Sequence, residues 1–340
     1  MVGPPIDPML AKNVARLPAD DGRAGSVVFE PKWDGFRCIA FHDAQGRVEL
    51  QSRQRRLMTR QFPDIARLVR EHTSPGTILD GELIIWASGR LDFGLLQRRN
   101  AAGPRRILDA VAEFPAHYMV FDVLQIPPDL DVRARPLVDR RALLEQLLAG
   151  APPQLPLSPQ TSSIEQAREW LETWPVVGVE GLVIKDAGGA YVPGRRGWSK
   201  LRQRASAEAI IGGVTGTLTQ PETLLLGRRD SGGVLRYVAR TRPVTGAQRA
   251  ELRGALHRVG AAGRWAAEHP WPRPLPAAWT GQWGTPEPLA YVQVEPDTIA
   301  EVEIDAAYER ETASWRQPPR FLRLRTDISI FDVPLADPSP

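Results

Sequence analysis

Lysine is scarce in this sequence of 340 residues, and its scarcity points to possible chemistry. Of the 43 Lys and Arg residues only four are lysines: Lys12, Lys32, Lys185 and Lys200. An arginine keeps its proton, whereas a lysine amine can lose one and attack an electrophile, or act as a compact charge on phosphate. Chance explains Lys12, and on this count alone it explains Lys185 and Lys200 as well. Lys32 needs a closer look because of its neighbours.

The segment from Glu30 to Arg37 has the residue types of a reactive loop around Lys32. Asp34 and Gly35 complete a Lys-x-Asp-Gly turn, in which the glycine permits a tight backbone, and Arg37 could hold an anion. A four-residue match is as compatible with an ordinary turn as with a catalytic loop. Lys32 is therefore a candidate nucleophile that needs support from the rest of the chain.

The elements that would position Lys32 are strands interspersed with helices. Apolar runs and turn signals predict strands over residues 36–42, 48–52, 77–86, 117–124 and 179–185. Helices are expected to open at Pro63, to end at Gly150, and to begin at a capping box of Ser162 and Glu165. Residues 1–28, rich in Pro and Ala, are expected to lie across the surface.

A composition shift near residue 205 predicts a domain boundary. Beyond it, strands are expected over residues 210–215, 223–226, 235–239, 289–294, 299–304 and 321–324. One helix is expected to carry Leu252, Ala255, Leu256 and Val259 on one face. Short strands with a single helix suit an oligonucleotide-binding barrel. The expected fold is α+β, with domains at 1–204 and 205–330 and a flexible tail at 331–340.

Composition excludes several classes of protein. The single cysteine, Cys38, excludes an internal disulfide and a thiolate zinc cluster, and the five histidines lack ligand spacing. No apolar run approaches the roughly 20 residues of a membrane span, so a cytoplasmic, bacterial protein without membrane contact is expected. The net charge is only +3. Clustered arginines suit phosphate contact, but they also suit the coding bias of a GC-rich genome.

Six segments in order give the site its context: Lys32-x-Asp-Gly, Ser52-Arg53, Asp80-Gly81-Glu82, Phe121-Asp122, Glu180 to Lys185, and Trp198 to Arg202. The set resembles the ATP-dependent DNA ligases, within the covalent nucleotidyltransferase superfamily that also includes RNA ligases and mRNA-capping enzymes. The resemblance runs from about residue 6 to about residue 330. It looks most like the small actinobacterial ligase C type, in which an adenylation domain precedes an oligonucleotide-binding domain.

The resemblance implies a three-step reaction. Lys32 attacks the α-phosphorus of ATP, releases pyrophosphate and carries AMP. The AMP passes to the 5′-phosphate of a nick, and the 3′-hydroxyl then displaces it to seal the strand. The implied substrate is nicked double-stranded DNA. The expected enzyme is a monomer in DNA repair, with partners such as an end-binding protein.

The resemblance also implies roles for individual side chains. Glu30 would contact the adenine amino group, Phe121 would stack on the base, and Arg37 and Arg53 would hold the nucleotide or the nick phosphate. The implied nucleotide-binding set is Glu30, Arg37, Arg53, Glu82, Phe121, Lys185, Lys200 and Arg202; the implied ligands of Mg²⁺ or Mn²⁺ are Glu82 and Glu180. Each has a simpler alternative, because Phe121 could be a core residue and the acids could be solvated strand ends.

Two positions depart from the family pattern. Arg202 and Ile328 stand where many ligases have lysine. The lysine missing at Ile328 suggests a slow first step. With 31 residues ahead of Lys32, no helical DNA-binding domain is expected before it. Two alternatives stay open: an RNA ligase or another nucleotidyltransferase acting on RNA ends, and a non-catalytic nucleic-acid clamp, against which the retained lysines and acids argue.

Overall fold

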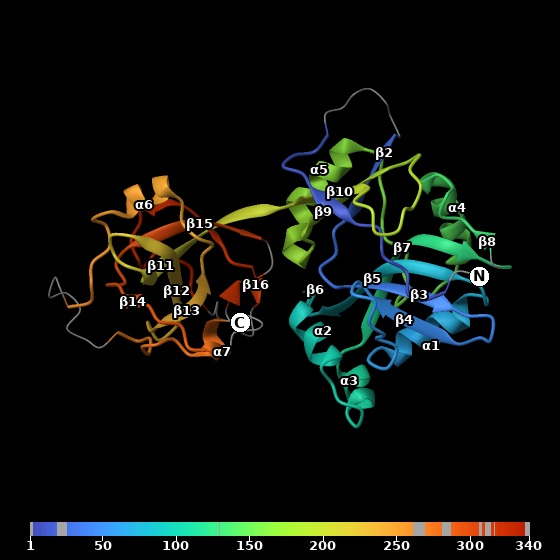
Figure 1. The fold of residues 1–340 in the computed structure, drawn as a ribbon, viewed down its shortest axis with the longest axis horizontal. Helices are drawn as coiled ribbons and strands as arrows, with labels where there is room; N and C mark the ends of the chain where they lie inside the picture. The colour runs from blue at the N-terminus through green and yellow to red at the C-terminus, as the bar shows by residue number, and fades with distance from the viewer. Residues whose placement is uncertain are drawn as a thin grey trace. The chain divides into compact units, whose positions relative to one another are not determined.

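The computed structural model describes residues 3–18, 26–128, 130–260, 269–280, 287–305, 308–309, 314–315 and 317–336. The chain divides into two compact units, residues 1–203 and 204–340 (Figure 1). Unit 1 contains every residue of the expected nucleotide and metal sites. Among the described residues, no helix is both long and apolar enough to span a bilayer.

The larger sheet of unit 1 is antiparallel and holds Arg37, Glu82 and Phe121. Its order is β4-β3-β5-β7-β8, and β6 pairs with β5. The strands are β3 (Phe36–His42), β4 (Val48–Ser52), β5 (Ile78–Ala87), β6 (Arg90–Leu91), β7 (Ala116–Ile126) and β8 (Leu130–Asp131). The strands predicted over 36–42 and 48–52 have these same bounds, because a short turn joins them into a hairpin.

Helices α1 (Pro63–His72), α2 (Phe93–Asn100) and α4 (Leu137–Leu147) pack against this sheet, and α3 (Ile107–Glu113) packs on α2. Proline in the first turn of α1 and Arg70 in its last turn match the preferences of helix ends. Phe62, Ile65 and Val69 are fully buried against the sheet, in one cluster with Leu144 of α4.

The second sheet of unit 1 carries the two lysines near the end of the unit. Its order is β1 (Ala11–Asn13), β10 (Trp198–Arg202), β9 (Gly181–Asp186) and β2 (Val27–Pro31), and β1 runs parallel to β10. Helix α5 (Ile164–Thr173) packs on it through Ala167 and Trp170, and the short helix η1 (Trp174–Val177) follows. The N-cap of α5 is Ser163, whose side chain accepts from Gln166 N, one residue after the predicted cap.

The N-terminal segment differs from the surface course expected for residues 1–28. Strand β1 is part of the second sheet, and Ile6 and Met9 are buried with 5% exposure. The backbone of Leu10 bonds to Arg195, so this segment is tied to the approach to β10. The expectation was wrong because the partner strand lies far away in the sequence. Residues 19–25 lie outside the described part.

Unit 2 is built on an antiparallel sheet of order β13-β12-β11-β15-β18, with β14 beside β11. The strands are β11 (Arg204–Gly216), β12 (Pro221–Arg229), β13 (Leu235–Arg240), β14 (Val292–Gln293), β15 (Ile299–Asp305) and β18 (Arg320–Arg325), with a separate pair of β16 (Tyr308–Glu309) and β17 (Ser314–Trp315). The helices are α6 (Gly246–Leu252) and α7 (Ala277–Thr280).

Three details of unit 2 correct the expectations. Helix α6 begins at the capping box of Thr245 and ends at Leu252, before Ala255 to Val259, because Arg253 is extended and Gly254 has a positive φ. Strand β14 has two residues where six were expected. Val333 and Ala336 are buried, so residues 331–336 pack on the unit rather than forming a frayed tail; residues 337–340 lie outside the described part.

Cys38 lies in the middle of β3 and is wholly buried. Burial raises the pKa of its thiol well above the ordinary value, and the charges of Asp80 and Glu82 add to the shift. The phenol of Tyr118 donates to the Cys38 carbonyl at 2.9 Å. Cys38 is therefore a core residue of the sheet.

Candidate active site

The loop that carries Lys32 is fixed by its backbone on both sides. The Lys32 N–H donates to the Gly181 carbonyl at 2.8 Å, and the Glu180 N–H donates to the Lys32 carbonyl at 2.9 Å. Gly35 lies so close to β5 that a Cβ there would overlap the Leu83 carbonyl oxygen. The glycine of the Lys-x-Asp-Gly turn is thus required by this close approach. The loop holds Lys32 between the two sheets' strand ends, β2 before it and β3 after it.

Lys32 and Glu180 form an ion pair, although 148 residues separate them. Their side chains are 17% and 5% exposed. Arg202 Nη2 lies 3.9 Å from the same carboxylate. The pKa of Lys200 is lowered by partial burial, and then by the charges of Arg202, Lys32 and Arg53. Lys32 and Arg202 thus share the carboxylate of Glu180, and Lys200 lies near enough to feel their charges and that of Arg53.

Glu82 approaches Lys32 from β5. It is half-buried, and burial raises the pKa of its carboxyl to about 8. The charges of Arg37 and Lys32 oppose this shift, whereas Asp34 and Asp80 add to it. Glu82 thus lies in the same electrostatic environment as Lys32, as the order of motifs predicts, but burial favours its protonated form at neutral pH.

Arg37 is held by a carboxylate of the protein. Its Nε and Nη2 each donate to Asp80 at 2.5 Å, and Asp80 is fully buried on β5. The guanidinium also lies over the rings of Phe121, at 4.5 Å, and Trp198, at 5.1 Å. Any anion that Arg37 binds must share it with Asp80. The expected phosphate contact of Arg37 stays a prediction.

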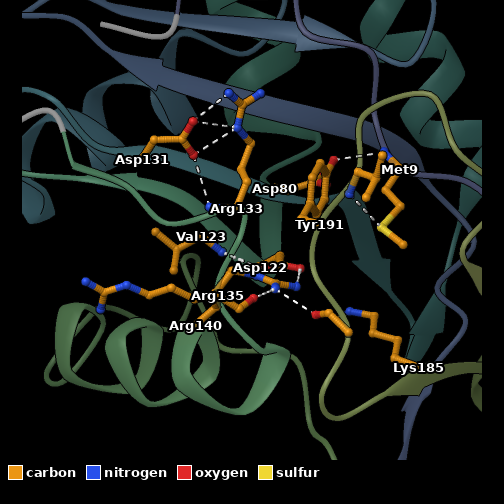
Figure 2. A network of polar contacts seen from close by, with 12 residues as sticks. Met9, Asp80, Asp122, Val123, Asp131, Arg133, Arg135, Arg140, Lys185 and Tyr191 are labelled. Carbon is orange, nitrogen blue, oxygen red and sulfur yellow. Dashed lines mark hydrogen bonds and ion pairs between the residues drawn. The ribbon is translucent and has the colours of Figure 1, made fainter.

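Tyr191 contacts Asp80 directly and Arg140 fixes the loop next to Tyr191, and Figure 2 shows the polar contacts of both. The Tyr191 hydroxyl donates to Asp80 at 2.6 Å and accepts from the Met9 N–H at 2.9 Å. Arg140 of α4 donates twice to Asp122 of β7, at 2.8 and 3.0 Å, and once to the Gly189 carbonyl, at 3.0 Å. Because Arg140 is buried, these bonds fix the loop before Tyr191 to β7.

Lys185 of β9 and Glu30 of β2 form a second ion pair at 2.7 Å, and both are buried. Gln160 donates to the other oxygen of Glu30 at 2.8 Å. The Lys185 ammonium lies 4.7 Å from the ring of Phe121 and 4.3 Å from that of Trp198. Glu30, Lys185 and Phe121 are thus together, as expected of a nucleotide site. The stacking of Phe121 on a base stays a prediction.

The carboxylates near Lys32 fit a magnesium ion held together with phosphates. Among the described residues, no group of three or more His, Cys, Asp and Glu side chains could hold a metal by itself. Mg²⁺ commonly takes one or two carboxylates and completes its shell with water and substrate phosphates. Glu180, and Glu82 once the metal displaces its proton, could supply those two carboxylates.

Sequence reasoning missed two supporting residues, Gln160 and Tyr191. Neither belongs to a recognisable motif, and each acts through a partner more than 100 residues away. A hollow of about 900 Å³ under the N-terminal segment, lined by Val14, Leu17, Leu171 and other side chains, includes none of the expected site residues. The candidate site is therefore identified by its charged side chains and not by this hollow.

Comparison with known proteins gives the class to which this site belongs. Residues 8–202 match the sequence profile of the ATP-dependent DNA ligase domain. The matched range contains the Lys32 loop and both of its carboxylates, Glu82 and Glu180. The chain belongs to the ATP-dependent DNA ligase family, and the resemblance found in its sequence is confirmed.

Relatives within the family cover nearly the whole chain. DNA ligase C2 of Mycolicibacterium smegmatis is 31% identical over 95% of this chain and 91% of its own length. DNA ligase C of Mycobacterium tuberculosis is 31% identical over 96% and 91%. A solved Lig E DNA ligase covers 93% of this chain and 99% of its own, with a TM-score of 0.54 at 19% identity. The α+β fold, a nucleotidyltransferase domain followed by an oligonucleotide-binding barrel, is confirmed.

The raised pKa of Glu82 predicts a pH-dependent stability. The native state holds this proton up to about pH 8, whereas a carboxyl with the ordinary pKa of 4.5 releases it in the unfolded chain. The free energy of unfolding should therefore fall as the pH rises between these values. Glu82→Gln stays neutral and should lack this loss. In thermal unfolding at pH 5 and pH 8, the unfolding temperature of the variant relative to that of the wild type should be higher at pH 8 than at pH 5. A difference that does not change with pH would mean that native Glu82 is already ionised at pH 5.

Proposed function

We propose that this enzyme seals nicks in double-stranded DNA with ATP, through AMP carried covalently on Lys32, and that it acts in DNA repair. The observation that carries the proposal is the placement of Lys32. A lysine fixed by backbone bonds on both sides faces two carboxylates and three further cations. This set suits attack on a phosphate, because the cations offset the charge that develops on the phosphate oxygens.

Glu180 prepares Lys32 for the first step. Attack on the α-phosphorus requires a neutral amine. The proton must leave the Lys32 Nζ, and the Glu180 carboxylate, already in contact with it, is in position to receive it. The N–P bond then forms as the bond to pyrophosphate breaks. Lys200 and Arg202 lie beside the same carboxylate and would hold phosphate oxygens during this change.

The ion pair of Glu30 and Lys185 would hold the adenine base. The buried Glu30, fixed by Lys185 and Gln160, would accept from the adenine amino group, next to the ring of Phe121. A bound Mg²⁺ would add positive charge at the phosphates and help to orient them. We assign Glu82 and Glu180 as the residues that would hold it. We assign residues 1–203 as the adenylation domain and residues 204–340 as the oligonucleotide-binding domain.

The proposed function is tested by incubation with α-labelled ATP or GTP, followed by sealing assays on DNA, RNA and mixed nicks. Label retained on the denatured protein with ATP, and closure of the DNA nick, are expected. Label without closure of the DNA nick but with closure of an RNA nick would favour the RNA ligase alternative. Absence of label would leave a nucleic-acid clamp.

Lys32→Arg should abolish the covalent adduct, because a guanidinium does not become a neutral nucleophile near physiological pH. The arginine keeps the positive charge beside Glu180, so the thermal unfolding temperature should stay close to that of the wild type. Retention of label in denaturing gels measures the adduct. An appreciable fraction of the wild-type yield would show that another residue is the nucleophile.

Glu180→Gln should slow adenylation by roughly 10- to 100-fold while ATP affinity changes little, because this carboxylate acts on the reacting amine and phosphate. Single-turnover rates at several Mg²⁺ concentrations, with ATP binding measured separately, check the prediction. The metal role would be excluded if affinity and rate fell equally and the Mg²⁺ dependence stayed unchanged.

Ile328→Lys should accelerate adenylation about tenfold, if it recovers roughly 1.4 kcal/mol of stabilisation of the leaving group. In this chain Arg323 pairs with Glu301, and Arg325 with Asp327 and Glu208, so neither arginine is a simple substitute for the missing lysine. Sealing of a nick that already carries AMP should not change.

The matched control is Ile328→Met, which keeps an apolar side chain among the residues that Ile328 contacts. It should leave both rates unchanged. Acceleration of both steps by the lysine variant, or of neither, would show that the missing charge does not limit adenylation. Thermal unfolding of both variants separates this result from any loss of packing.

A further inference from the structure

The α2–α3 hairpin, residues 93–114, carries arginines that the reaction at Lys32 does not use. Helices α2 and α3 lie next to each other beyond β6 in unit 1 (Figure 1). Arg98, Arg105 and Arg106 are exposed on the hairpin, whereas Arg99 is fully buried. The hairpin therefore has one arginine inside the fold and three on its surface.

Arg99 makes the hairpin a fixed element. Its guanidinium pairs with Asp64 of α1, donates to the Phe114 carbonyl at 2.8 Å and to the Gln61 carbonyl at 3.2 Å, and lies 4.7 Å from the ring of Phe62. These bonds join both helices of the hairpin to α1. A surface fixed in this way loses little conformational entropy when it binds a partner.

The outer side of the hairpin has a hollow with two arginines on its rim. This hollow of about 350 Å³ between the helices is lined by Arg98, Arg106, Gly103, Glu113 and neighbouring small residues. The Arg98 guanidinium is placed there over the ring of Phe114, at 5.0 Å. At the tip, nothing lies within 4 Å of a Cβ added at Gly103, so a bulky partner can approach the backbone. Glu113 is the acidic member of this lining.

The hairpin starts beside the nucleophile's loop. The rings of Phe36, four residues after Lys32, and Phe93, the first residue of α2, meet edge to face with centroids 5.2 Å apart. Leu91, just before α2, packs against Gly178, just ahead of Glu180. Helix α2 has eight residues, so the tip stands about 12 Å farther out.

We infer that the α2–α3 hairpin is a docking element for the sugar-phosphate backbone of the duplex beside the nick, contacted through Arg105 and Arg106. The inference rests on the proposed nick-sealing function. The tip lies about 12 Å beyond the start of α2, and at about 3.4 Å of helix axis per phosphate of a strand this length corresponds to roughly three to four phosphates, so the tip reaches phosphates at least that far from the nick. Arginine suits this partner because its planar fork donates twice to a phosphate. The hairpin holds the duplex in register and takes no part in the reaction at Lys32.

The test is Arg105→Gln combined with Arg106→Gln, which removes two exposed charges. Binding to nicked DNA should weaken about tenfold, and the slope of log affinity against log salt should fall by about two. Adenylation of Lys32 by ATP should keep its wild-type rate. The matched control is Arg67→Gln with Arg70→Gln on α1, which removes two exposed charges from the neighbouring helix and should leave affinity and slope unchanged.

A second arm uses nicked duplexes with uncharged methylphosphonates three to six positions from the nick, on one side or the other. On one of the two sides, the methylphosphonates should weaken binding of the wild type by about as much as the double substitution does. They should not weaken binding of the variant any further. The docking element would be refuted by a variant that binds like the wild type, by an equal loss in the control, or by insensitivity to both methylphosphonate sides. Failure of the wild type to take up label or to seal would instead refute the proposed function.

Discussion

The active site depends on the pairing of its buried cations with carboxylates. Lys32 pairs with Glu180, Arg37 with Asp80, and Lys185 with Glu30. A buried charge without a partner costs several kcal/mol, so none of these cations could be held in the interior alone. Each pair also joins different strands or loops. The same contacts thus meet the electrostatic requirement of the site and help to hold neighbouring strands together within each sheet.

This pairing shapes how a triphosphate can be bound. In the free protein Lys32 and Arg37 already have negative partners, so the phosphates of ATP must share these cations with the carboxylates or displace the carboxylates. Arg37 and Lys185 depend less on their carboxylate partners, because both cations also lie over the aromatic rings of Phe121 and Trp198. The phosphate end of the site is therefore adaptable, and the base end, fixed by Gln160 and Lys185 on Glu30, is rigid.

The sequence predicted whatever is encoded locally or by ordered motifs. The hairpin of β3 and β4 was predicted correctly because its strands and turn are contiguous, and the order of the charged motifs led to the family. The course of β1 could not be foreseen, since it pairs with a strand that begins at residue 198. Likewise, no local pattern shows that Gln160 reaches Glu30. The apolar spacing after Leu252 resembled a helix, but those side chains belong to the segment that follows α6.

The burial of Cys38 has a practical consequence for following this enzyme in solution. Thiol reagents attack the thiolate, and here both access and ionisation are suppressed. As the chain has no other cysteine, it has no reactive sulfhydryl in its folded state. A cysteine placed at a chosen exposed position would then be a unique attachment point for a fluorophore or spin label. The natural chain thus already has the background that such labelling usually requires engineering to create.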